Sequence, residues 1–397
     1  MNKLFRLSTL AALLASPTAP VAMGTAAFAQ PQPLVQVPPV PQPVLWTRPA
    51  AEALLAYVEG VGAEGLKPAA YGPDRLSRAI AARDEGAMAS AATDIFLRLA
   101  SDLSGGAVNG NARVDWHLAS TQLDAAAQRA LMARALADGG VAEALNSLLP
   151  THPQYAGLRR ALANTPAEDE ATRDLIRANL ERWRWMPRSL GARHVIVNVP
   201  AFTAAIVDNG QVTARHRTVV GALRTPTPQL SATIRAVTFN PWWNVPQSII
   251  REMGGRFGSD YEVRRNGQQL IVRQQPGPRN SLGRVKIEMP NDHAIYLHDT
   301  PAQQLFSRPV RAFSHGCIRT QNVRDFAAHL LAPTGSWGRP RIDQAIGAGR
   351  TVSANLSAPI PVYIAYFTAA ATNEGEIVRY NDIYGRDVPV KRALNAI

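Results

Sequence analysis

The chain has 397 residues, of which 46% are hydrophobic and 18% are charged, and its formal net charge is +12. This composition excludes disorder for most of the chain, because disordered chains carry fewer apolar and more charged residues. The length predicts two domains, each able to bury a core of its own. A single cysteine excludes an intramolecular disulfide and a cysteine-rich metal site.

The first 29 residues are typical of a secretory signal peptide. Lys3 and Arg6 precede a short apolar stretch, and the small residues Ala27 and Ala29 predict cleavage near Ala29 and a periplasmic location. The apolar stretch is too short for a membrane helix, so we expect no stable membrane span. After export, the basic surplus would meet lipid head groups or a carboxylate-rich cell wall, and we expect no nucleic-acid partner.

The next segments predict a linker and a helical domain. Residues 30–49 are rich in proline, which favours an extended linker. Residues 50–163 predict a helical scaffold domain, whose Ala- and Leu-rich segments are interrupted by glycine and proline. Residues 164–191 predict a connecting helix that is capped by Thr165, begins at Pro166 and ends near Pro187, because Thr-Pro followed by Glu is typical of a capped helix start.

Residues 192–387 change from the helical period to an alternating one and predict a mostly β domain. Asp208-Asn209-Gly210 is typical of a hairpin turn. Strands are expected at 194–199, 202–207, 212–220, 236–239, 269–272, 285–289, 294–297 and 362–366, with a helix at 323–331. Residues 388–397 are expected to be a C-terminal tail. The predicted fold class is therefore α+β, an all-α domain followed by a mostly β domain.

One short region contains the groups that thiol chemistry needs. Cys317 is the only thiol, and His298, 19 positions upstream at the end of an apolar strand, is a candidate base. Gly316 allows close backbone approach, so the N–H groups of Gly316 and Cys317 are candidate donors to a developing oxyanion. A buried, inert cysteine is the alternative that the residue type alone favours.

The surrounding motifs favour the reactive alternative. His298 followed by Ser314-His315-Gly316-Cys317 resembles the active-site signature of the L,D-transpeptidases, the YkuD-type catalytic domain. Further segments resemble the larger, YcbB-like branch of that family: ERWRWM (181–186), NPWWNVP (240–246), QPGP (275–278), IYLHDTP (295–301) and, in the helical region, GLKP (65–68). The resemblance implies a YkuD-like catalytic domain with a short lid, preceded by a scaffold domain.

The resemblance also implies a mechanism and a substrate. Cys317 would attack a carbonyl of a peptidoglycan stem peptide, and His298 would accept the thiol proton; a diaminopimelate amine of a second stem would resolve the thioester. The backbone carbonyl of Asp299 is a candidate to orient the imidazole, and Tyr296 is a candidate donor to the oxyanion. No metal and no cofactor are expected, and carbapenems are the expected inhibitors.

Four further residues are candidates for substrate contact: Ser314, His315, Arg319 and Trp243. Three of them also have a purely structural alternative. His315 points away from Cys317 on an extended chain, which favours a structural hydrogen bond. Arg319 either holds a substrate carboxylate or braces the loop, and Trp243 either lines the substrate groove or packs in a core.

Two departures from the larger relatives leave alternatives open. The peptidoglycan-binding module is missing between the scaffold and catalytic regions, and the lid between Pro246 and His298 is short. The link type, 3-3 or 1-3, is therefore undecided. An L,D-carboxypeptidase or amidase using the same Cys/His pair, and a non-catalytic wall-binding protein, are the competing functions. A sortase-like enzyme lacks support because the cysteine follows Ser-His-Gly.

Overall fold

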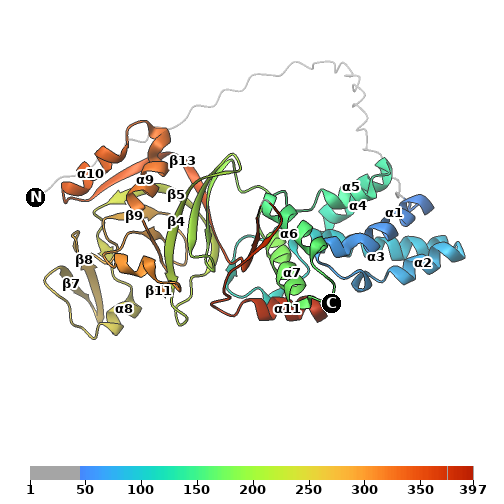
Figure 1. Cartoon of the computed structure of the whole chain (residues 1–397), viewed down its shortest axis with the longest axis horizontal. Helices are drawn as coiled ribbons and strands as arrows, with labels where there is room; N and C mark the ends of the chain where they lie inside the picture. The colour runs from blue at the N-terminus through green and yellow to red at the C-terminus, as the bar shows by residue number, and fades with distance from the viewer. Residues whose placement is uncertain (1–44, 373, 397) are drawn as a thin grey trace, which may run out of the picture. The chain divides into compact units, whose positions relative to one another are not determined.

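The computed structural model describes residues 45–372 and 374–396 (Figure 1). The predicted signal peptide and residues 30–44 of the predicted linker lie outside the described residues. The linker prediction ends too late, because Trp46 is already buried and its indole N–H donates to Thr93 Oγ1 at 2.9 Å. Among the described residues, no helix has the length and apolar character that a membrane crossing needs.

The first half of the described chain is mainly helical, as predicted. Proline at the first turn of α2 and a left-handed Gly139 after α4 give two of the boundaries. The apolar face predicted from a spacing of four, Ile95, Leu99 and Leu103, is buried in α3. The helices are α1 (Arg48–Gly60), α2 (Pro73–Ala82), α3 (Glu85–Gly105), α4 (Ala125–Asp138), α5 (Val141–Asn146) and α6 (Pro153–Asn164).

The connecting helix α7 (Glu170–Trp185) begins four residues later than predicted, because its cap is Asp169 and not Thr165. Asp169 is the true cap, since its carboxylate accepts hydrogen bonds from both the backbone N–H and the hydroxyl of Thr172. Thr165 instead closes the end of α6, where its hydroxyl donates to the Ala161 carbonyl at 2.7 Å. The helix therefore begins after Asp169, whose carboxylate accepts two hydrogen bonds, and not after the Thr165 that the Thr-Pro-x-Glu pattern favours.

A large sheet forms the second half of the described chain, and its order of paired strands closes into a ring. β9 pairs with β10 on one side and with β5 on the other, which encloses the main hydrophobic core together with α9 and α10. The strands are β2 (Arg193–Asn198), β3 (Thr203–Asp208), β4 (Gln211–Gly221), β5 (Gln229–Phe239), β9 (Val285–Glu288), β10 (Leu297–His298), β11 (Ala312–Ser314), β12 (Ile318–Thr320) and β13 (Val352–Ala365). The two helices are α9 (Val323–Leu331) and α10 (Arg339–Gly347). The α+β prediction is confirmed.

Local signals predicted several of these elements well. The hairpin turn between β3 and β4 has positive φ at Asn209 and Gly210, as the Asp-Asn-Gly pattern requires. Helix α9 has the predicted bounds. The strand expected at 294–297 is shifted to β10, because Ala294 has a left-handed φ of 52° that a strand cannot accommodate.

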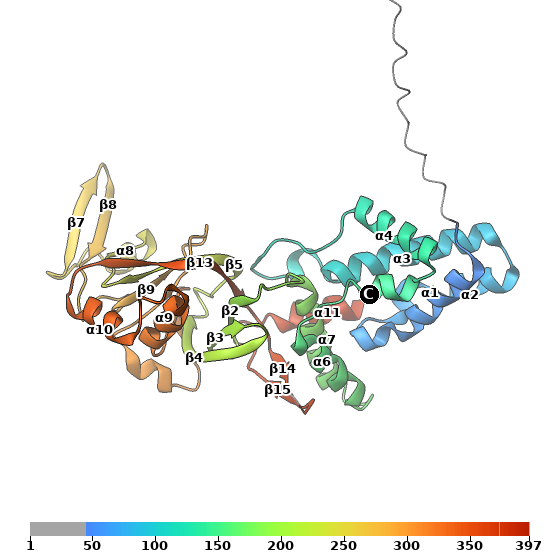
Figure 2. The same ribbon diagram turned by 90° about the horizontal axis from the view of Figure 1, so that it is seen from above.

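The short lid is a small unit with its own core. It consists of α8 (Gln247–Glu252) and a three-stranded sheet of β6 (Trp243–Asn244), β8 (Gln269–Gln274) and β7 (Tyr261–Asn266). Trp243, Val245, Ile250, Val272 and Leu282 form its buried cluster. Figure 2 shows β7 and β8 standing apart from the strands of the large sheet.

Two elements join the helical and β regions in ways that the sequence did not suggest. Within the region predicted to be helical, β1 (Trp116–His117) pairs in parallel with the start of β5. The predicted C-terminal tail is instead largely a helix, α11 (Asp387–Ala396), because Val390 and Leu394 are one turn apart and pack with Ala178 and Trp185 of α7. A further hairpin, β14 (Ala369–Ala371) with β15 (Ile377–Arg379), follows β13.

Candidate active site

Two adjacent parallel strands place four polar side chains on one face. In the register of β10 and β12, Leu297 lies opposite Ile318, and both are fully buried in the core. Strand side chains alternate between faces, so the residues on either side of that pair point away from the core. These residues are Tyr296, His298, Cys317 and Arg319. The predicted nucleophile and base are therefore diagonal neighbours, roughly 7–8 Å apart at the backbone.

The imidazole of His298 is buried and fixed in one orientation. Its Nδ1 lies 2.5 Å from the backbone carbonyl oxygen of Asp299, and because a carbonyl only accepts, Nδ1 carries the proton. Nε2 is consequently the nitrogen with the basic lone pair. Burial first, and then the charges of Arg319 and Lys286, lower the pKa of His298 to about 3. The ring is therefore neutral over the physiological range.

Asp299 supplies more than its carbonyl. Its carboxylate accepts a hydrogen bond from the backbone N–H of Arg284 at 2.8 Å, and burial raises the carboxyl pKa. Gly283 has a φ of 61°, and a Cβ there would lie 2.5 Å from this carboxylate. Only glycine fits at that position, so the chain at 283–284 and the residue that orients His298 are packed as one unit.

The thiol of Cys317 is half-buried and weakly bound. Its Sγ lies 3.6 Å from the backbone carbonyl oxygen of Ala294. Burial raises the thiol pKa, whereas hydrogen bonds from Tyr296 and the charges of Lys286 and Arg319 lower it. With burial the largest of these effects, the resting pair is a neutral thiol and a neutral imidazole.

A hydrogen-bond chain runs from the lid to the thiol through Tyr296. The Tyr296 hydroxyl interacts with Cys317 and with the Trp243 side chain, whose indole N–H is a donor only. Burial raises the pKa of Tyr296, so its hydroxyl stays protonated. Trp243, a predicted substrate contact, is 8% exposed and lies in the lid core, where it supports Tyr296.

The Ser-His-Gly-Cys turn is held by its own hydroxyl. Ser314, another predicted substrate contact, is 3% exposed; its Oγ donates to the Cys317 carbonyl at 2.5 Å and accepts from the Gly316 N–H at 3.2 Å. Gly316 has a φ of 108°, which other residues rarely adopt. Of the two predicted oxyanion donors, the Gly316 N–H is thus already engaged, which leaves the Cys317 N–H as the better placed.

The remaining two predicted contacts lie on different sides of the turn. His315 is exposed, and its Nε2 lies 2.8 Å from a carboxylate oxygen of Glu252 at the end of α8. Arg319 shares the face of Cys317, and its Nε is buried without a hydrogen-bond partner among the described residues. Arg319 is therefore the candidate whose hydrogen-bonding capacity is not used within the described chain.

Two residues of the site were missed by sequence reasoning. Lys286 lies opposite His298 in the register of β9 and β10, and its Nζ is 4.8 Å from the centre of the Tyr296 ring. Asn291 holds the loop before β10, because its side chain bonds the backbone of His293 and Ile295 and so fixes Ala294 between them. An Asn just before an apolar run is a turn signal that could have indicated the second residue.

Among the described residues, no group of three or more His, Cys, Asp or Glu side chains is arranged as a metal site. The groups that converge at the site are a thiol, an imidazole, a phenol and two cations. Such a set suits nucleophilic attack by sulfur on a carbonyl, with proton transfer to the imidazole.

Two protein families match parts of the chain. Residues 192–362 match the family described as the L,D-transpeptidase catalytic domain, YkuD, and residues 41–162 match the family described as a scaffold domain. A Haemophilus influenzae protein named "Putative L,D-transpeptidase" is 31% identical over 255 residues, which are 58% of this chain and 51% of that protein. The chain thus spans about half the length of this curated relative.

Solved structures of L,D-transpeptidases are more distant. One from Mycobacterium smegmatis is 16% identical with a TM-score of 0.25, covering 44% of this chain and 58% of that one. L,D-transpeptidase 3 from Mycobacterium tuberculosis is 12% identical with a TM-score of 0.24, covering 44% and 60%.

The two family matches and the fold define the class: a helical scaffold domain followed by a β-rich catalytic domain. The chain contains a domain of the YkuD family, the L,D-transpeptidase catalytic domain, at residues 192–362 and a scaffold domain at residues 41–162. Residues 163–191, between the two matches, are accounted for by the end of α6, by α7 and by the short segment that leads to β2.

Proposed function

We propose that the chain forms peptide cross-links between peptidoglycan stems through a thioester on Cys317. The observation that carries this proposal is the placement of Cys317 and His298 on one face of adjacent strands, within the region that matches the catalytic domain. Both groups are neutral at rest, and the base has a fixed tautomer.

Acylation follows from these protonation states. As Sγ attacks the donor carbonyl carbon, the thiol proton passes to Nε2 of His298, so no isolated thiolate has to exist in the buried site. The oxyanion accepts hydrogen bonds from the Cys317 N–H and the Tyr296 hydroxyl. When the carbon–nitrogen bond breaks, the protonated imidazole returns its proton to the leaving amine, and a thioester remains.

Deacylation reverses the roles of the same groups. The neutral amine of a diaminopimelate residue on a second stem attacks the thioester carbon, and His298 accepts the proton that the nitrogen loses. The carbon–sulfur bond breaks, the sulfur takes the proton back from the imidazole, and the free enzyme is restored. Lys286 and Arg319 favour the steps that place negative charge on sulfur or oxygen.

The same proposal places the chain in the periplasm after removal of the predicted signal peptide near Ala29. In the periplasm the enzyme would meet its substrate, the peptidoglycan stems. N-terminal sequencing of the exported protein tests this part, and a mature protein that still begins at Met1 would contradict it.

Substitution of the nucleophile is the direct test. We expect Cys317→Ala to abolish cross-linked dimers from purified muropeptides and to abolish covalent labelling by a carbapenem, because no other thiol is present. The thermal unfolding midpoint should change little, since the half-buried thiol makes only one weak hydrogen bond to the backbone. Intact-mass analysis of the products measures both activities and distinguishes 3-3 from 1-3 links.

The competing functions give different masses in the same experiment. Shortened monomers without dimers would identify an L,D-carboxypeptidase or amidase, in which water resolves the thioester. A wild-type protein that gains no carbapenem mass and makes no product would identify a wall-binding protein. Dimers from Cys317→Ala would overturn the proposed mechanism.

A further inference from the structure

The loop of residues 291–295, which leads into β10, forms part of the surroundings of the nucleophile. The carbonyl oxygen of Ala294 in this loop lies 3.6 Å from Cys317 Sγ and accepts the thiol hydrogen bond. A Cβ on Gly316 would lie 3.2 Å from Ile295 Cδ1, so the loop also packs against the turn that carries the thiol. The position of the loop therefore decides where the thiol finds its acceptor.

The loop has a strained conformation, and Asn291 supports it from one side. Ala294 has a left-handed φ of 52°, which residues other than glycine rarely adopt. The side chain of Asn291 accepts from the N–H groups of His293 and Ile295 at 3.1 and 3.2 Å. Both His293 and Ala294 are exposed, so the core does not hold them. A loop that stores strain at an exposed residue persists only when its surroundings hold it in place.

A second support comes from the scaffold domain. His117, at the end of β1 and inside the matched scaffold region, contacts His293 with ring centres 4.1 Å apart and planes at 45°. Strand β1 is fixed in turn, because it pairs in parallel with β5 and places His117 opposite Leu230. One side chain of the scaffold domain thus touches the loop beside the nucleophile of the catalytic domain.

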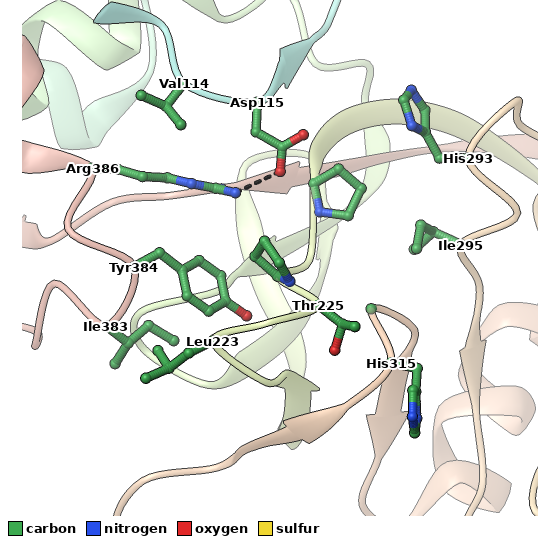
Figure 3. Close-up of a pocket in the computed structure, with 13 residues that line it drawn as sticks. Val114, Asp115, Leu223, Thr225, His293, Ile295, His315, Ile383, Tyr384 and Arg386 are labelled. Carbon is green, nitrogen blue, oxygen red and sulfur yellow. Dashed lines mark hydrogen bonds and ion pairs between the residues drawn. The ribbon is translucent and has the colours of Figure 1, made fainter. Parts of the chain in front are cut away.

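The ring of His117 is itself held in one orientation. Its Nε2 lies 2.8 Å from one carboxylate oxygen of Asp115, and Arg386 donates to the other oxygen at 2.6 Å. Figure 3 shows the Asp115–Arg386 pair on one side of a pocket and His293 on another. Arg386 is only 4% exposed, so this series of contacts is anchored in the interior. It runs from the buried arginine through Asp115 and His117 to the loop.

We propose that His117 is a positioning residue for the nucleophile, acting through its contact with His293. The contact keeps the carbonyl of Ala294 against Cys317 Sγ, which holds the sulfur on the reactive face. Rotation about the Cβ–Sγ bond moves only the proton, so the proton passes to His298 while the sulfur stays in place. Such positioning lowers the barrier to attack without binding the substrate more tightly. This inference rests on the proposed function, in which Cys317 attacks the donor carbonyl.

Carbapenem acylation of the full chain tests the contact, because Cys317 is the sole thiol and intact mass reports on it alone. Rates over a range of carbapenem concentrations separate the maximal acylation rate from the half-saturating concentration. We expect His117→Ala to lower the maximal rate about three- to tenfold, the contribution of one aromatic pair, and to leave the half-saturating concentration unchanged. The thermal unfolding midpoint should change little, because the His117 side chain is 38% exposed.

Two further substitutions separate the ring contact from the hydrogen bond to Asp115. His117→Phe keeps a ring against His293 but cannot bond Asp115, and it should recover most of the wild-type rate. His117→Gln keeps a polar group without a ring and should be as slow as His117→Ala. His329→Ala is the matched control, because His329 is an exposed histidine on α9, which packs on the core side of the sheet, and its maximal rate should equal that of wild type.

A double-mutant cycle shows whether the two histidines act through one contact. His293→Ala should slow acylation as much as His117→Ala does. The double variant should be no slower than either single variant, because each substitution already removes the same contact.

Three results would overturn the assignment: a wild-type maximal rate in folded His117→Ala, a His117→Phe as slow as His117→Ala, or losses that add in the double variant. Each of them leaves the proposed function in place, because the wild-type protein would still acylate and cross-link. A wild-type protein that gains no carbapenem mass and forms no dimers would instead remove the proposed function, and this inference with it.

Discussion

Two buried polar clusters of this protein show how burial serves structure in one place and chemistry in another. The junction cluster, around Glu181 and Arg184 of α7, holds the scaffold region to the connecting helix. The reaction cluster, around His298 and Cys317, lies on the sheet face beneath the lid. Both exclude water from charged or titratable groups, yet they differ in how completely those groups are hydrogen-bonded.

The junction cluster satisfies its own charges. Glu181 and Arg184 are both 0% exposed and paired at 2.5 Å. The second carboxylate oxygen of Glu181 accepts from the Val108 N–H at 2.8 Å and the Trp185 indole at 2.9 Å, and Arg184 also donates to the Glu64 carbonyl at 2.7 Å. Because both carboxylate oxygens of Glu181 already accept hydrogen bonds, the cluster holds these segments together and leaves no acceptor for a ligand.

The reaction cluster leaves groups free. The thiol has one weak backbone contact, Nε2 of His298 keeps its lone pair, and Nε of Arg319 is buried without a partner among the described residues. A buried polar group without a hydrogen-bond partner lowers the stability of the folded protein. Such groups are concentrated at functional sites, where a bound substrate supplies the missing partner. The difference between the two clusters is thus a difference in unused hydrogen-bonding capacity.

The largest effect should come from breaking the closed cluster. Glu181→Gln leaves Arg184 buried without its counter-charge, which we expect to lower the free energy of unfolding by about 3–5 kcal/mol. Thermal unfolding measures this, and carbapenem acylation per folded molecule should be unchanged. Glu52→Gln is the control, because its pair with Arg48 is half exposed and worth less than about 1 kcal/mol. An unfolding midpoint that Glu181→Gln leaves unchanged would contradict this account.

The open cluster was easier to predict from sequence than the closed one. His298 and Cys317 stand in short motifs whose spacing fits neighbouring strands, and alternation along a strand then places Tyr296 and Arg319 with them. These signals are local, as are the Asn209–Gly210 turn and the bounds of α9. Local turn chemistry and periodicity are what a single sequence encodes most directly.

Contacts between distant segments were not predictable in this way. Nothing near Trp116 indicates that it pairs with β5, and nothing near Val390 indicates that the C-terminal residues pack on α7. Lys286 reaches the site only because β9 lies beside β10 in that register. Ser314 and Trp243 were assigned to substrate because they stand in or near motifs, but the fold uses their hydrogen bonds to hold Cys317 and Tyr296. Such roles depend on pairings made across the whole chain.

A smaller effect is expected from removing one hydroxyl of the open cluster. Tyr296→Phe takes a donor from the thiol and the oxyanion, so acylation by a carbapenem should slow by about 100-fold. The ring remains packed, and the cost in stability should be about 1 kcal/mol, because the Trp243 indole loses its acceptor. Tyr363→Phe removes a hydroxyl that bonds the Leu190 carbonyl at 3.3 Å and should leave acylation unchanged. Equal rates for the two variants would exclude a role for Tyr296 in the reaction.

The smallest effect distinguishes two buried histidines by pH. Burial lowers the pKa of His298 to about 3 and that of His152, stacked on Trp183 at the end of α7, to about 4. Unfolded imidazoles bind a proton near pH 6.5, so between pH 6.5 and 4 the unfolded chain holds more protons than the folded one. Stability should therefore fall as the pH is lowered through this window, and His152→Gln and His298→Gln should each flatten the slope.

Only His298 takes part in acylation, so the pH profile of the rate separates it from His152. The wild-type rate of carbapenem acylation should stay level from pH 7 to about 5, since His298 remains neutral there, and His152→Gln should give the same profile. The rate should stay level above pH 7 as well, because burial raises the thiol pKa and the neutral pair remains the reactive form. A fall in rate centred near pH 6.5 would mean that His298 titrates as an exposed imidazole, and the contrast between the closed and open clusters would lose its electrostatic basis.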